Sequence, residues 1–132
     1  MNYELRIKVS GQVIKGEGYG RKLGFPTANL DRRDYSRRKL KIKYGIYAGI
    51  VEVINYQLSI INYSAAIVIG PVDKTGLPKI EAYLLKFKGN LYGRKLSLLL
   101  VKYLRGFKHF KDVEGLKQQI NEDIKIIKKL NY

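Results

Sequence analysis

Segments with the pattern of β-strands recur along this chain, which leaves few folds open to it other than a β-sheet. Leu5, Ile7 and Val9 point to one side of the backbone. Arg6 and Lys8 point to the other side, and this is the period of a half-buried strand. Alternation predicts strands at Tyr3–Val13 and Lys79–Phe87, and β-branched and aromatic residues predict one at Tyr44–Ile54. Two further strands are expected at Leu58–Ile69 and Arg94–Leu104.

The period changes near the C-terminus. Asp112 is a suitable N-cap for a helix, Glu114 suits the positive end of its dipole, and Lys128 and Lys129 suit the negative end. The apolar residues of this region are spaced three or four apart and define one helix face: Val113, Leu116, Ile120, Ile124 and Ile127. Five or six strands followed by one helix, with no helix between the strands, predict a mainly β, antiparallel sheet that closes into a small barrel capped by the helix.

The segments between these elements are expected to be turns and loops. A hairpin turn is predicted at Lys88–Asn90 and an irregularity near Asn62–Ser64. The glycine-rich residues 15–29 disfavour regular structure. The highly charged Asp31–Lys43 predicts a mobile loop, and Gly70–Pro78 predicts a turn or loop.

Composition excludes several kinds of chemistry. The 132 residues predict one domain, residues 1–132, with one core. There is no cysteine, and His109 is the single histidine, so disulfides, a cysteine nucleophile and a multi-histidine metal site are excluded. No segment has the roughly 18 apolar residues that would span a bilayer. The N-terminus does not resemble a signal peptide, so we expect a cytoplasmic protein without membrane contact. We also expect the protein to act as a monomer.

The net charge of +15 favours partners that are anionic. Nucleic acid, a membrane surface and phosphorylated small molecules are all compatible with it. The alternative is that the 26 lysines and arginines, against 11 acidic residues, only form a soluble surface. Charge alone does not decide between these interpretations.

The glycine-rich loop is the first candidate binding site. Gly16, Gly18 and Gly20 carry no side chains, so their backbone N–H groups could approach an anion, and Arg21 and Lys22 could hold phosphate charge. The spacing is neither that of a P-loop nor that of a dinucleotide-binding turn. An ordinary glycine turn is the alternative interpretation.

The segment Phe25-Pro-Thr-Ala-Asn29 is more specific. Pro26 stiffens the backbone, and on an extended backbone Thr27 and Asn29 direct their oxygens to the same side. Two neutral oxygens could supply part of a Mg²⁺ coordination shell, with nucleotide phosphates and water completing it. Alternatively, these side chains cap a turn.

Residues 11–29, with this motif in its glycine-rich context, resemble the opening signature of the ATP-dependent riboflavin kinases. Residues 80–93 are similar to the second signature of that family, and residues 103–110 and the helix after them resemble its C-terminal part. The resemblance implies a six-stranded antiparallel Greek-key barrel with a C-terminal α-helix. It also implies transfer of the ATP γ-phosphoryl group to the riboflavin 5′-hydroxyl, giving FMN and ADP, without onward synthesis of FAD.

The resemblance also implies a role for individual residues. Glu81 matches the catalytic base, and it is the only carboxylate between Asp73 and Asp112. A solvent-facing strand residue paired with a lysine is the alternative for Glu81. The implied metal ligands, for Mg²⁺, are Thr27 and Asn29. The implied nucleotide-binding residues are Gly16, Gly18, Gly20, Lys22 and Tyr92, and the implied flavin-binding residues are Arg105, Lys108 and Phe110.

Two departures from the family pattern stand out. Gly70–Pro78 replaces a segment that commonly reads Gly-x-x-Pro-Thr-Phe, and Tyr19 replaces a frequent arginine. Two other functions stay open at this point. One is a basic β-barrel that stacks nucleic-acid bases on some of its 11 tyrosines. The other is a flavin or nucleotide binder without turnover. The expected partners are riboflavin and ATP rather than nucleic acid.

Overall fold

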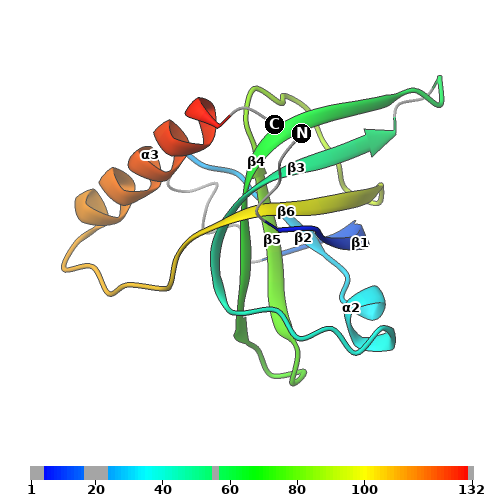
Figure 1. Ribbon diagram of the computed structural model, residues 1–132, viewed down its shortest axis with the longest axis horizontal. Helices are drawn as coiled ribbons and strands as arrows, with labels where there is room; N and C mark the ends of the chain where they lie inside the picture. Colours follow the sequence, from blue (N-terminus) through cyan, green and yellow to red (C-terminus); the bar gives the residue numbers. More distant parts are fainter. Residues whose placement is uncertain (1–4, 17–23, 55–56, 131–132) are drawn as a thin grey trace.

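The computed structural model describes residues 5–16, 24–54 and 57–130. Within them the strands form one closed antiparallel barrel in the order β1-β2-β5-β4-β3-β6, followed by the C-terminal helix α3 (Figure 1). This confirms the predicted fold class. The elements are β1 Ile7–Ile14, β2 Ala28–Leu30, α2 Arg33–Arg37, β3 Gly45–Ile54, β4 Ile60–Val72, β5 Pro78–Leu84, β6 Lys95–Arg105 and α3 Val113–Lys129.

Strand alternation fills the barrel as the sequence predicts. On β5 the buried side chains are Pro78, Ile80, Ala82 and Leu84, and the residues between them face outward and are half-buried. On β6, Leu96, Leu98 and Leu100 are almost fully buried in the same core. The side chain of Glu81, between Ile80 and Ala82 on β5, therefore lies on the outside of the barrel.

Helix α3 packs against this outer surface. Its N-cap is Asp112, whose side chain accepts a hydrogen bond from the Gly115 backbone N–H at 2.8 Å, as predicted. Ile124 and Ile127 contact a cluster on the outside of the sheet that includes Ala48. Among the described residues, no helix has the length and apolar character needed to cross a bilayer.

The prediction of a loop over Asp31–Lys43 is wrong in part, because α2 forms inside it. Asp34 accepts hydrogen bonds from the Ser10 backbone N–H at 3.0 Å and from Arg38 at 2.9 Å. These two donors hold the pKa of the Asp34 carboxyl below its usual value. Tyr35 is buried in the barrel core, so one aromatic anchor and paired charges order a segment that looks only polar in sequence.

Several predicted strand boundaries are also corrected. β4 does not stop at Ile69 but continues to Val72, because a shift of register after Ile69 lets Val72 pair with Pro78. The irregularity expected near Asn62–Ser64 is absent, since β3 and β4 pair there without a register shift. β5 ends at Leu84, before the predicted Phe87, and the predicted turn at Lys88–Asn90 forms no hairpin, because β5 and β6 are not neighbours in the barrel. β2 is a short strand at the end of the glycine-rich segment.

Candidate active site

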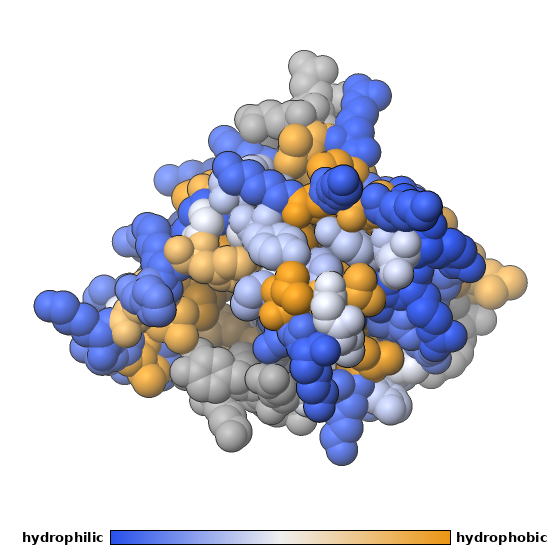
Figure 2. Space-filling view, turned by 90° about the horizontal axis from the view of Figure 1, so that it is seen from below, coloured by the Kyte–Doolittle hydropathy of each residue, from blue (hydrophilic) through white to orange (hydrophobic). Residues whose placement is uncertain are grey.

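A cleft of about 720 Å³ lies between β1, β2, the end of β5 and the segment that follows it. It brings together four of the predicted site residues: Gly16, Thr27, Asn29 and Tyr92. Seen from below, the molecule is hydrophilic over most of its surface and is hollowed left of centre, on the side of α3 (Figure 2). Gly18, Gly20 and Lys22 lie outside the described residues.

Asn29, a predicted metal ligand, and Glu81, the predicted base, lie opposite each other on the adjacent strands β2 and β5. Asn29 on β2 is the register partner of Glu81 on β5, and Ala28 is the partner of Ala82. Asn29 and Glu81 are half-buried, while Leu30 and Ala82 beside them are buried. Because directly opposite residues of an antiparallel pair share a face with Cβ atoms about 4.5–5.5 Å apart, the amide and the carboxylate lie side by side on the outer face. Asn29 is thus a strand residue and not a turn cap.

The backbone at Gly16 lies against the Asn29 side chain. A Cβ built at Gly16 would overlap the amide group, with Oδ1 only 2.7 Å away. Any side chain at position 16 would therefore displace the Asn29 amide. This close approach, and not an unusual backbone angle, explains why glycine is needed here.

The donor set fits a metal ion that arrives with a nucleotide better than a resident one. Among the described residues there is no group of three or more His, Cys, Asp or Glu side chains that could hold an ion. The Thr27 hydroxyl, the Asn29 amide oxygen and the Glu81 carboxylate are hard oxygen donors of the type that Mg²⁺ prefers, and Mg²⁺ commonly completes its shell with substrate phosphates and water.

Aromatic residues around this face were not predicted as site residues. Tyr83 lies two positions after Glu81 on the same outward face of β5, and its ring meets that of Phe25 edge-on at 5.7 Å. Tyr83 also packs against the cluster under α3, so it lies between the cleft and the helix. The alternation along β5 was the signal that could have identified it.

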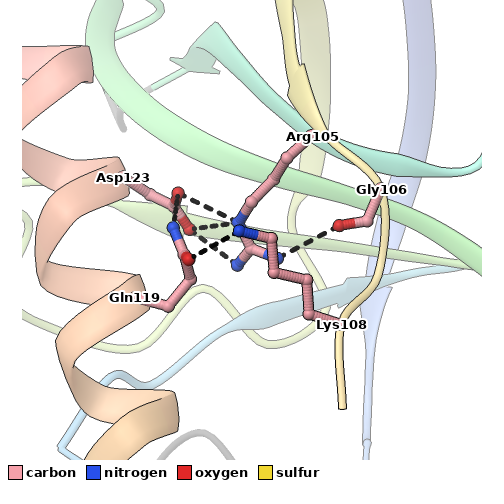
Figure 3. Close-up of polar contacts among 5 residues, drawn as sticks. All are labelled: Arg105, Gly106, Lys108, Gln119 and Asp123. Atoms are coloured by element: carbon pink, nitrogen blue, oxygen red, sulfur yellow. Dashed lines mark hydrogen bonds and ion pairs between the residues drawn. The ribbon is translucent and has the colours of Figure 1, made fainter. Parts of the chain in front are cut away.

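Arg105 and Lys108, two of the predicted flavin-binding residues, are joined to α3 instead of the cleft (Figure 3). The Arg105 guanidinium donates to both carboxylate oxygens of Asp123 at 2.8–3.1 Å and to the Gly106 carbonyl at 3.2 Å. Lys108 Nζ donates to Gln119 Oε1 at 3.1 Å, and Gln119 Nε2 donates to Asp123. Phe110, the third residue, is half-buried beside Gly115 at the start of α3.

The two groups of residues are linked by one row of strand partners. Asn29 pairs with Glu81, Glu81 with Val68, Val68 with Ile46, and Ile46 with Arg105. The row crosses the outer surface of the sheet from β2 to β6, and α3 packs over part of this surface. Residues far apart in the sequence are in this way placed on one continuous face.

Comparison with known proteins finds relatives over nearly the whole chain. A family model described as "Flavokinase: Riboflavin kinase" matches residues 3–131. The protein named RNA-binding riboflavin kinase RibR, from Bacillus subtilis, is 33% identical over 92% of this chain and 50% of its own length. The bifunctional riboflavin kinase/FMN adenylyltransferase of Escherichia coli K12 is 34% identical over 87% of this chain and 35% of its own. The chain thus spans about half or less of these curated relatives.

Solved structures share the fold. A Streptococcus pneumoniae protein described as a macrolide-efflux protein superposes with a TM-score of 0.78 and 25% identity, over 96% of this chain and 40% of its own. Riboflavin kinase from Trypanosoma brucei superposes with a TM-score of 0.71 and 23% identity, over 92% of this chain and 74% of its own. Because the family model covers nearly the whole sequence, this chain belongs to the riboflavin kinase family.

Proposed function

We propose that this protein transfers the γ-phosphoryl group of ATP to the 5′-hydroxyl of riboflavin, giving FMN and ADP. The observation that carries the proposal is the pairing of Asn29, which lines the cleft together with Gly16 and Thr27, with Glu81 on the neighbouring strand. A protein that only binds nucleic acid needs neither a metal-binding pair nor an opposed carboxylate. Membership of the riboflavin kinase family supports the same reaction.

The proposed chemistry relies on position and charge. Phosphoryl transfer has a loose transition state, so an enzyme mainly aligns its substrates and neutralises charge. Thr27 and Asn29 would hold Mg²⁺ with their side-chain oxygens, and the ion would supply positive charge for the phosphates when it is bound. Glu81 would accept the hydrogen bond of the 5′-hydroxyl and take its proton as the oxygen attacks. Gly16, Gly18, Gly20, Lys22 and Tyr92 would contact the nucleotide.

The flavin would lie toward α3. Lys108 is exposed and Phe110 half-buried in the segment that leads into this helix. Phe110 offers an aromatic face to the flavin ring, and the Lys108 ammonium has donors beyond the one that reaches Gln119. Arg105 secures the helix, and each of its terminal nitrogens carries a second N–H for a ligand. These three residues stay our proposed flavin contacts.

We further propose that residues 1–132 act as a single domain, as a monomer, and in the cytoplasm. One closed barrel with α3 packed on its outer surface accounts for the described residues, which supports a single domain.

Chromatography of riboflavin incubated with the protein, Mg²⁺ and ATP tests the proposed activity. We expect a peak of FMN that depends on both ATP and the metal, because the proposed site holds the nucleotide through the ion. Heat-denatured protein is the control. Riboflavin that stays unchanged with every nucleoside triphosphate tried would contradict the proposal.

Thr27→Ala is expected to weaken the use of Mg·ATP more than the binding of riboflavin. The change removes one proposed oxygen ligand, so more Mg²⁺ should be needed for half-maximal rate, by roughly tenfold or more. Titration of Mg²⁺ at fixed ATP measures this shift, with Ser36→Ala, which removes an exposed hydroxyl on α2 outside the cleft, as the control. A Mg²⁺ dependence equal to that of the parent protein would show that Thr27 is no ligand.

A further inference from the structure

The strand that carries Asn29 is held to its neighbours by few backbone bonds. In the described residues β2 pairs with β5 through two register positions, Ala28 with Ala82 and Asn29 with Glu81. On its other side β2 pairs with β1 through Leu30 and Asn29. Yet a strand that slips by one residue turns every side chain to the opposite face. A three-residue strand therefore needs further support if Asn29 is to stay opposite Glu81.

Arg32 supplies contacts where this short ladder ends. If the pairing of β2 with β5 continued, Arg32 would lie opposite Pro78, the first residue of β5. The Arg32 guanidinium donates to the Pro78 carbonyl oxygen at 3.1 Å. It also forms an ion pair with Asp73 at 2.9 Å and donates to the Thr75 hydroxyl at 3.2 Å. One side chain thus joins the chain that leaves β2 to the turn that leads into β5.

The turn that receives Arg32 is itself well ordered by its own hydrogen bonds. Asp73 Oδ1 accepts from the hydroxyl and the backbone N–H of Thr75, and the Asp73 backbone N–H donates to the Leu77 carbonyl at 3.0 Å. These Thr75 bonds, with Arg32 nearby, lower the pKa of Asp73 to about 2. The side chains of Arg32 and Asp73 are 14% and 23% exposed, so water screens their pairing less than it would a fully exposed pair. Asp73 is an anion at any pH at which the protein is assayed.

We infer that Arg32 is a positioning residue for the proposed reaction. By joining the end of β2 to the start of β5, it keeps the Asn29 amide and the Glu81 carboxylate opposite each other across the site. This inference rests on the proposed function, because it gives that function a residue outside the cleft. It also assigns a role to Gly70–Pro78, the segment that departs from the family pattern: it provides Asp73, Thr75 and Pro78, the three partners of Arg32.

Arg32→Gln tests the inference, with Arg33→Gln as the matched control. Arg33 is the next residue, is 84% exposed and pairs with Asp31, not with the β4–β5 turn. We expect Arg32→Gln to lower kcat by roughly ten- to a hundredfold, since small misplacements of reacting groups have effects of this size. The Mg²⁺ concentration for half-maximal rate should rise, and the KM for riboflavin should stay within about twofold, because the flavin side is remote from β2.

Hydrogen exchange gives a readout that does not depend on activity. The backbone amides of Asn29, Glu81 and Ala82 should exchange faster in Arg32→Gln than in the parent protein. In Arg33→Gln their exchange rates should equal those of the parent. Arg32→Lys should restore part of kcat, because lysine keeps the charge opposite Asp73 but lacks the planar fork that reaches three acceptors. If Arg32→Gln fails to fold, Arg32→Lys tests the positioning role through the same measurements of kcat, Mg²⁺ dependence and amide exchange.

The outcomes separate the two proposals. If the parent protein forms no FMN, the proposed function is wrong, while the exchange data still decide whether Arg32 holds the two strands together. If the parent is active, then unchanged kcat, Mg²⁺ dependence and amide exchange in Arg32→Gln would overturn the positioning role. Equal decreases of kcat in Arg32→Gln and Arg33→Gln would overturn the positioning role as well. So would an effect of Arg32→Gln that is confined to the KM for riboflavin.

Discussion

Glu81→Gln is expected to reduce kcat by about 10²–10⁴-fold while both substrates still bind, the range typical of a lost general base. Glutamine keeps the shape of the side chain beside Asn29 and still accepts a hydrogen bond. It cannot take a proton from the 5′-hydroxyl or align it through a charged acceptor. The measurement is kcat together with riboflavin affinity, on protein whose folding has been checked.

Glu52→Gln is the matched control for this experiment. Glu52 on β3 also points outward from the barrel, and its carboxylate pairs with Lys8 at 2.8 Å at the surface. Exposed pairs of this kind contribute about 0–1 kcal/mol to stability, so the variant should fold. Glu52 neither lines the cleft nor pairs with Asn29 or Glu81, so kcat should change by no more than a few-fold. A Glu81→Gln protein that keeps more than about a tenth of parental kcat would remove Glu81 from the catalytic role.

Asp123→Ala is expected to lower the free energy of unfolding by about 3–5 kcal/mol, because it leaves the Arg105 guanidinium without its partner. The Asp123 side chain is 5% exposed and that of Arg105 14% exposed, and three hydrogen bonds join them. Gln119, which donates to Asp123, loses its acceptor as well. Chemical denaturation of the variant and the parent measures the difference.

Glu122→Ala is the control on the same helix. Glu122 is exposed one residue earlier, so its removal should change stability by no more than about 0.5 kcal/mol. If Asp123→Ala were as stable as Glu122→Ala, the buried ion pair would not be what holds α3 against β6. Because α3 borders the proposed flavin side, the destabilised variant should also bind riboflavin more weakly than the control.

The strands and the terminal helix could be predicted because their signals are local. Alternation from Ile7 to Ile14 and the spacing of Ile120, Ile124 and Ile127 each depend on a few neighbouring residues. α2 could not be predicted, because its order comes from Tyr35 entering a core built by distant strands. β2 was missed for a similar reason: its three residues become a strand only through pairing with β1 and β5.

The candidate site divides in the same way. Thr27 and Asn29 could be predicted from one short motif on extended backbone. The pairing of Asn29 with Glu81, more than fifty residues later, depends on strand register, which the sequence pattern does not specify. Arg32 gave no signal either, because it lies among many basic residues, and only the position of the β4–β5 turn distinguishes it from Arg33.

Transfer of a labelled phosphoryl group tests the proposed activity most directly. ATP radiolabelled in its γ-phosphoryl group is incubated with riboflavin, Mg²⁺ and the protein, and the flavins are separated from the nucleotides. We predict that the label appears in FMN in a one-to-one ratio with the ADP formed, and that Glu81→Gln suppresses both. Label released only as inorganic phosphate, or ATP left intact in the presence of riboflavin, would contradict the proposed reaction.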